Sequence, residues 1–102
     1  MIAGLSVAVV MPALNEEGVI GSTLSGIPAD LVDTVVVADN GSEDGTAAEA
    51  AARGACVVSE ARRGYGAACQ AALRELRRRG APDIVVFLDA DGSEPIEELE
   101  RL

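Results

Sequence analysis

Four short runs of aliphatic residues, separated by segments with helical character, constrain the fold of this sequence more than any other feature. The runs are rich in valine and isoleucine, do not alternate between apolar and polar residues, and lie at Leu5–Met11, Thr34–Ala38, Ala55–Val58 and Ile84–Leu88. Continuous runs of this kind are typical of strands covered on both faces, as in a parallel sheet. The sequence therefore predicts four buried, parallel strands.

The segments between these runs predict the helices that connect parallel strands. The first helix is expected to follow Asn15, a residue type suited to capping a helix, and to carry its apolar side chains on one face. Those side chains are Val19, Ile20, Leu24 and Ile27. A second helix is expected over Ala47–Arg53 and a third over residues 66–79, each followed by a glycine. Pro95 predicts the first turn of a fourth helix.

The alternation of strands and helices predicts the fold class. We expect an α/β fold, a doubly wound, Rossmann-like parallel sheet with right-handed crossovers. A chain of 102 residues can bury one hydrophobic core but has no room for a second lobe. Residues 1–102 are therefore expected to form a single domain.

The charge of the chain limits the classes of function. Eight arginines stand against 17 aspartates and glutamates, which gives a net charge of −9, and the sequence contains neither lysine nor histidine. A chain this acidic lacks the basic face that nucleic acids need. Without histidine, a metal ion would be held by carboxylate oxygens, which favours Mg²⁺, Mn²⁺ or Ca²⁺ over zinc.

The cysteines and the apolar runs bear on cellular location. Cys56 and Cys69 do not have the spacing of a metal or redox motif, so both are expected to be buried thiols that act as small apolar side chains. The N-terminal region does not resemble a signal peptide. The longest apolar run, Val7–Leu14, is too short for a membrane span of about 20 residues. These features predict a cytoplasmic protein.

A polar or glycine-rich cluster follows each predicted strand. The four clusters are residues 12–17, 39–46, 62–66 and 89–93. In open α/β sheets, ligands bind beyond the carboxyl ends of the strands, and parallel strands bring these ends to one edge of the sheet. The sequence therefore predicts a binding site built from all four clusters.

Two of the clusters carry carboxylates with candidate roles. Asp89 and Asp91 can hold one divalent ion that keeps open positions for a diphosphate, the alternative being a turn with helix-capping acids. Asp39 can accept a hydrogen bond from a nucleobase N–H, although Asp-Asn-Gly-Ser is also good turn chemistry. A calcium loop at residues 39–46 is excluded, because Gly41 stands where an oxygen ligand is needed.

The cluster that follows the third run has the chemistry of a phosphate-binding loop. It reads Arg62-Arg63-Gly64-Tyr65-Gly66 and precedes a predicted helix. Glycines let backbone N–H groups approach a phosphate, and arginine adds charge-assisted hydrogen bonds. The alternative is a flexible loop that binds no phosphate.

Together, the four clusters resemble the motifs of family 2 glycosyltransferases. The matching segments are Pro12–Glu17, Val37–Thr46, Arg63–Ala68 and Phe87–Gly92. The likeness is greatest to the branch that resembles dolichol-phosphate mannosyltransferase and other polyprenyl-phosphate sugar transferases. This resemblance implies the nucleotide-diphospho-sugar transferase (GT-A) fold and Mg²⁺ or Mn²⁺ as cofactor. It also implies a nucleotide-diphospho-sugar donor and an acceptor such as a polyprenyl phosphate at the cytoplasmic face of a membrane.

The resemblance also implies roles for individual residues. Those expected to bind the nucleotide are Pro12, Ala13 and Glu16 beside the nucleoside, Asp39 at the base, Arg63 near the phosphates and Asp89 at the ribose. Asp91, with Asp89, is expected to bind the metal that bridges the diphosphate. No residue of this chain is assigned as the catalytic base, which is expected beyond Leu102.

The chain departs from the family in length, since family members are roughly twice as long, as expected for catalytic domains above about 200 residues. It is therefore expected to be the N-terminal, nucleotide-binding half. On the family's strand order, Ile84–Leu88 becomes an exposed edge that favours self-association. Two alternatives are a nucleotide-binding fragment without transferase activity and a haloacid-dehalogenase-like phosphatase. The phosphatase is suggested by the sequence of Leu88–Ser93, although that motif normally opens its domain.

Overall fold

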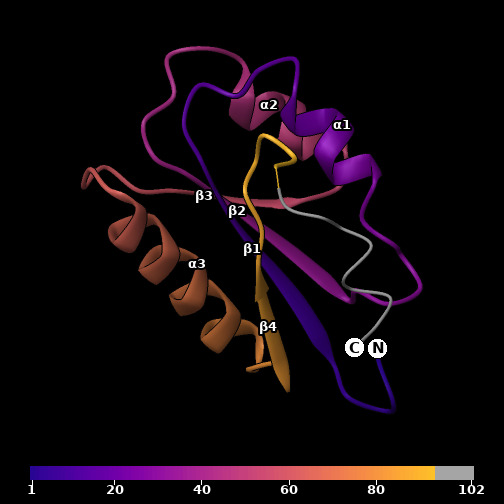
Figure 1. Cartoon of the computed structure of the whole chain (residues 1–102). Coiled ribbons are helices and arrows are strands. Elements are labelled where there is room, and N and C mark those ends of the chain that lie inside the picture. Colours follow the sequence, from indigo (N-terminus) through magenta and orange to yellow (C-terminus); the bar gives the residue numbers. More distant parts are fainter. Residues whose placement is uncertain (94–102) are drawn as a thin grey trace.

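The protein is a parallel four-stranded sheet flanked by helices, seen in a computed structural model that describes residues 1–93 (Figure 1). The elements in chain order are β1 (Val7–Ala13), α1 (Ile20–Ser25), β2 (Thr34–Asp39), α2 (Thr46–Ala52), β3 (Cys56–Ser59), α3 (Tyr65–Arg79) and β4 (Ile84–Phe87). The strands are ordered β3-β2-β1-β4, and every neighbouring pair is parallel. The expected doubly wound α/β fold is confirmed.

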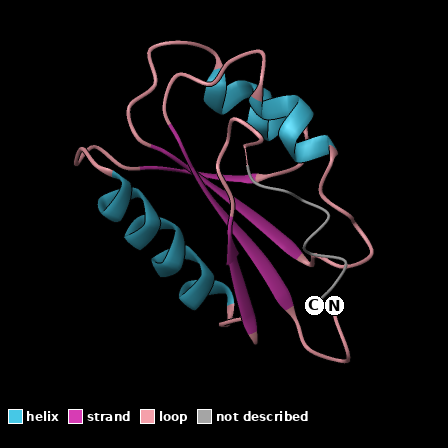
Figure 2. Ribbon diagram, viewed as in Figure 1, coloured by secondary structure: helices cyan, strands magenta, loops and turns pink. Residues whose placement is uncertain are grey.

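Two hydrophobic clusters lie on opposite faces of the sheet. Helices α1 and α2 cover one face and α3 covers the other, as Figure 2 shows. Successive residues of β1 enter different clusters: Val9 packs with α1 and α2, and Val10 packs with α3. Residues 7–11 are all fully buried. The strand is apolar at every position because both of its faces are covered.

The first helix starts later than the sequence predicts. Asn15 does not cap it, because the backbone of Asn15 has a φ of 52° and helix α1 begins at Ile20 with Val19 as its N-cap. The Asn15 side chain instead accepts a hydrogen bond from the Glu43 N–H, on the loop after β2. Of the predicted apolar face, Ile20 and Leu24 are buried, whereas Val19 is 41% exposed and residue 27 lies beyond the helix. The helix expected from Pro95 falls outside the described residues.

Strand β1 extends two residues further than predicted, so that Pro12 and Ala13 belong to the strand. Proline is tolerated there because of the direction in which its nitrogen points. The Val10 carbonyl accepts a hydrogen bond from the Leu88 N–H, so the backbone N–H and C=O groups of even-numbered β1 residues point toward β4. Pairing with β4 ends at Val10, opposite Phe87. The missing N–H of Pro12 therefore removes no bond from the ladder.

Strand β4 pairs with β1 and has no second neighbour within residues 1–93. Phe87 is 42% exposed at its end. Self-association through this edge stays a prediction, to be checked by sedimentation at micromolar concentration. Over the same described residues, no helix combines the length and the apolar character needed to cross a membrane.

Candidate functional site

The carboxyl ends of the strands meet at one edge of the sheet, where the structure forms an open pocket of about 340 Å³. The pocket is lined by Pro12, Ala13, Leu14, Asn40, Arg63, Gly64, Tyr65 and Ala68. Three of the residues predicted to bind a nucleotide, Pro12, Ala13 and Arg63, thus meet in one place. Its lining comes from the end of β1, the first residue after β2, and the junction of β3 with α3.

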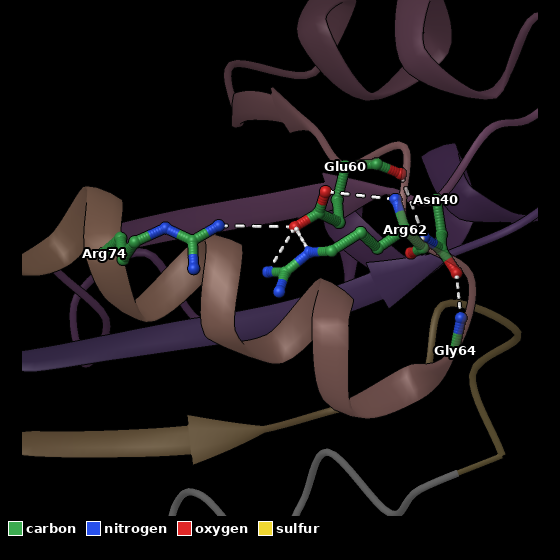
Figure 3. Close-up of polar contacts among 5 residues, drawn as sticks. All are labelled: Asn40, Glu60, Arg62, Gly64 and Arg74. Carbon is green, nitrogen blue, oxygen red and sulfur yellow. Dashed lines mark hydrogen bonds and ion pairs between the residues drawn. The ribbon is translucent and has the colours of Figure 1, made fainter.

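Asn40 links this pocket to the loop between β3 and α3 (Figure 3). Its side-chain Nδ2 donates hydrogen bonds to the carbonyls of Glu60 at 3.0 Å and Arg62 at 2.6 Å. Its Oδ1 accepts a hydrogen bond from the Gly64 N–H at 2.9 Å. The sequence predicts a turn at Asn40 and carries no signal for this contact, because the partners of Asn40 lie 20–24 residues away in the chain.

Glu60 organises the charges of the same loop. Its Oε1 accepts hydrogen bonds from Arg62 Nε at 3.1 Å and Nη2 at 2.8 Å, and from Arg74 Nη2 at 3.3 Å. The Arg62 guanidinium and backbone N–H hold the pKa of the Glu60 carboxyl at about 2, and Arg74 adds to this effect. Arg62 is therefore engaged in an ion pair within the protein, with 60% of its side chain exposed.

The Glu60 ion pair predicts a specific acid sensitivity. Because the pKa of Glu60 is lowered from 4.5 to about 2 on folding, its stabilising effect is complete above pH 4.5 and is lost as the pH falls toward 2. In this range the urea midpoint of the wild-type protein should fall more steeply than that of Glu60→Gln. Other carboxyls with lowered pKa values, such as Glu75, are present in both proteins and cancel in the difference. Parallel acid profiles would contradict the assignment.

Arg63 remains exposed and lies beside the turn after β2. Within residues 1–93 it forms no ion pair. A methyl group added to Gly41 would lie 4.0 Å from the Arg63 guanidinium carbon, so the cation is close to the turn at residues 39–41. Asp39 ends β2 at this turn, where it is half-buried and its Oδ1 accepts a hydrogen bond from the Ser42 N–H at 3.3 Å. Arg63 thus lines the pocket without a carboxylate partner among residues 1–93, and Asp39 lies at the neighbouring turn.

Asp89 and Asp91 follow β4 at the same edge of the sheet but do not line this pocket. Ser93 joins them: its N–H donates to Asp91 Oδ1 at 2.9 Å and its hydroxyl donates to Asp89 Oδ2 at 3.1 Å. The Ser93 N–H and hydroxyl lower the pKa of Asp91 below its usual value. From the other side, the buried Thr23 hydroxyl of α1 donates to the Ala90 carbonyl at 3.0 Å.

The two carboxylates fit a hard divalent cation. Both offer oxygen ligands, and neither is paired with an arginine in the described part of the chain. No group of three or more potential metal-ligating side chains occurs within residues 1–93. Such a site would leave several coordination positions to water and to a bound diphosphate, as is usual for Mg²⁺.

Glu16 does not line the pocket, and its backbone instead joins two loops. The Glu16 N–H donates to Thr46 Oγ1 at 2.8 Å, and the Thr46 hydroxyl donates to Asp44. Four further backbone N–H groups donate hydrogen bonds between the two loops. The Asn15 N–H donates to Ser42 Oγ, and the Glu43 N–H donates to Asn15 Oδ1. The Glu17 N–H donates to Asp44 Oδ2, and the Gly45 N–H donates to Glu17 Oε1. These contacts hold the loop after β1 against the loop after β2.

Thr46 is the buried centre of this contact, with no exposed surface. Replacing it by valine keeps the shape but leaves the Glu16 N–H without its acceptor. We expect Thr46→Val to lower the free energy of unfolding by about 1–3 kcal/mol, measured by urea denaturation. Thr34→Val is the matched control, because the Thr34 hydroxyl has no hydrogen bond within residues 1–93. Equal stability of the two variants would argue against the contact.

The two thiols have different surroundings. Cys69 is buried, as expected, and burial raises the pKa of its thiol. Cys56 is only half-buried, and its Sγ accepts a hydrogen bond from Arg79 Nη2 at 3.0 Å. The prediction of full burial is therefore wrong for Cys56. Its strand, β3, lies at a sheet edge, where the end of α3 covers it incompletely.

The fold and the site define a Rossmann-like α/β protein. At the carboxyl edge of its sheet lie a pocket lined by the Arg63 side chain and a pair of aspartates. The sequence decides the particular family: residues 8–102 match the model of glycosyl transferase family 2, and the chain belongs to that family. Its fold is that of GT-A glycosyltransferases. This membership favours a glycosyltransferase over the phosphatase alternative.

The chain is also similar in sequence to glycosyltransferases of mycobacteria. An uncharacterized glycosyltransferase of Mycobacterium bovis is 43% identical over 100 residues, covering 98% of this chain and 43% of the relative. The glucosyl-3-phosphoglycerate synthase of Mycolicibacterium paratuberculosis is 42% identical over 100 residues, covering 87% of this chain and 29% of the relative. The chain thus spans less than half the length of these relatives. The likeness to glucosyl-3-phosphoglycerate synthases replaces the expected likeness to dolichol-phosphate mannosyltransferase.

Solved structures give the same result. The glucosyl-3-phosphoglycerate synthase of Mycobacterium tuberculosis in complex with Mn²⁺, UDP and glucosyl-3-phosphoglycerate is 41% identical, with a TM-score of 0.70 over 86% of this chain and 34% of that chain. The same enzyme with UDP alone is 42% identical, with a TM-score of 0.71 over 87% of this chain and 35% of that chain. A further structure of that enzyme contains Mg²⁺ and UDP.

Proposed function

We propose that this chain is the donor-binding part of a glycosyltransferase that uses a uridine-diphospho-sugar together with Mn²⁺ or Mg²⁺, and that it forms a single domain. The observation that carries the proposal is the pocket with Arg63 in its lining, at the same sheet edge as the Asp89–Asp91 pair. The relatives that contain UDP with Mn²⁺ or Mg²⁺ support the choice of nucleotide and metal.

In this proposal, the pocket binds the nucleotide and the aspartate pair binds the metal. Pro12 and Ala13 pack against the nucleoside, and Glu16 borders it through the loop that it stabilises. Asp39 accepts a hydrogen bond from the base N–H, and Arg63 donates to the diphosphate.

Asp89 faces the ribose or the metal, and Asp91 holds the metal. A bound divalent ion would act as a Lewis acid that neutralises the nucleoside-diphosphate leaving group. The base that activates the acceptor is not assigned to any of the described residues.

For the acceptor we propose a molecule that carries a phosphate group. Two sources share this chemistry: a phosphorylated small acid, as in the name of the synthase relatives, and a polyprenyl phosphate, as in the motif resemblance. The relatives favour the small acid. We place the enzyme in the cytoplasm as part of this proposal, in keeping with its free thiols.

Calorimetric titration with UDP, in Mn²⁺ and then in EDTA, tests the donor site. Binding that requires the metal is the expected result, and no binding in either buffer would contradict the proposal. A transfer assay with UDP-glucose, run separately with 3-phosphoglycerate and with a polyprenyl phosphate in detergent, distinguishes the acceptors. UDP binding without transfer to either acceptor would favour the non-catalytic, nucleotide-binding alternative.

A further inference from the structure

The loop between β3 and α3 is shaped by a side chain from outside the loop. Asn40 is only 7% exposed, and it uses both its donor and its acceptor atoms on this loop. Nδ2 binds the carbonyls of Glu60 and Arg62, and Oδ1 binds the N–H of Gly64. The three backbone groups lie on both sides of Arg63 in the sequence, so Asn40 fixes the main chain before and after that residue.

The two arginines of the loop differ in their charged neighbours. Glu60 lies between Arg62 and Arg74 and accepts hydrogen bonds from both (Figure 3). The Arg62 side chain is thereby engaged in an ion pair, although 60% of it stays exposed. Arg63, the next residue, has no carboxylate partner within residues 1–93 and lies beside Gly41. The position of its guanidinium depends on the course of the backbone that carries it.

Asn40 also binds the backbone of Gly64, at the turn that leads into α3. Gly64 has a φ of 119°, a conformation that favours glycine, and it directly precedes helix α3. Its N–H is bound by Asn40 Oδ1. The hydrogen bond from Gly64 to Asn40 thus connects the turn between Arg63 and α3 to the residue that follows β2. Both Asn40 and Gly64 line the pocket.

We propose that Asn40 is a positioning residue for donor binding, which acts by holding the backbone on both sides of Arg63 so that the guanidinium faces the diphosphate. This inference rests on the proposed function, because Arg63 is assigned there to the diphosphate. Only an amide of this length supplies two donors and an acceptor at the same point; alanine supplies neither, and an ionised aspartate keeps only the acceptor.

A double-mutant cycle tests this role. The Kd of UDP in the presence of Mn²⁺ is measured for the wild type, Asn40→Ala, Arg63→Ala and the double variant. We expect Asn40→Ala to weaken binding about tenfold, in the range typical of coupled neighbours. In the Arg63→Ala background the same change should have almost no further effect, because the side chain that Asn40 positions is already gone. Gln70→Ala, which removes an exposed amide from α3, should bind UDP like the wild type.

The outcomes separate the two proposals. Equal losses from Asn40→Ala in both backgrounds would overturn the positioning role, since a structural defect is independent of Arg63. A wild-type protein that binds no UDP would contradict the proposed function itself. Arg63→Ala with unchanged UDP affinity would refute the assignment of Arg63 and the inference with it. If thermal unfolding shows that Asn40→Ala does not fold, Asn40→Asp, which keeps the bond from Gly64, takes its place in the cycle with a smaller expected loss.

Discussion

Asp39→Asn is expected to weaken the binding of UDP about 10- to 150-fold. In the proposed site the Asp39 carboxylate accepts a hydrogen bond from a base N–H, and a hydrogen bond to a charged group contributes about 1.5–3 kcal/mol. Each 1.4 kcal/mol corresponds to a tenfold change in affinity. Isothermal titration calorimetry in the presence of Mn²⁺ measures the change directly.

The asparagine variant separates this role from a role in the turn. The amide oxygen at position 39 can still accept the bond that Asp39 Oδ1 receives from the Ser42 N–H, and the amide NH2, which only donates, then replaces the oxygen that would accept from the base. The turn and the stability should therefore change little. Asp30→Asn, at an exposed residue with no hydrogen bond in the described part, controls for the loss of one negative charge. Affinity within error of this control would return Asp39 to a turn-forming role.

Asp91→Ala is expected to abolish most of the contribution of Mn²⁺ to UDP binding. Asp91 is exposed at the edge of the sheet, and its pKa lies below its usual value. We expect a loss of more than about tenfold in Mn²⁺, because even outer partners of a metal site typically contribute about 10–100-fold to affinity. In EDTA the variant and the wild type should bind UDP equally, since only the bridge through the metal is removed.

Asp30→Ala is the matched control for this second experiment. It removes the same charge from an exposed position away from the strand ends. If both alanine variants bound UDP in Mn²⁺ with equal affinity, Asp91 would not be a metal ligand. Equal losses in Mn²⁺ and in EDTA would instead show that Asp91 supports the loop after β4 without contacting a metal.

The glycosyltransferase motifs could be recognised from the sequence alone because each motif is local in the chain. Each occupies a few consecutive residues after a strand, and the topology of a parallel sheet then brings them to one edge. Pro12, Ala13 and Arg63 could therefore be predicted as neighbours, and they do share a pocket. The role of Glu16 beside the nucleoside, which the family resemblance implies, stays a prediction: Glu16 lies outside the pocket lining, and its backbone N–H donates to Thr46.

The sequence by itself determined the order of strands and helices along the chain and the burial of the central strands on both faces. Runs such as Val7–Met11 are apolar at every position, and a strand of this kind is stable only between two layers of helices. The tertiary structure alone decided where α1 begins and what holds the pocket. Asn15 and Asn40 both have polar side chains that suit local turns or caps, yet each is satisfied by a partner on another segment. Long-range hydrogen bonds of this kind leave no periodic signal, because they depend on which loops the sheet places side by side.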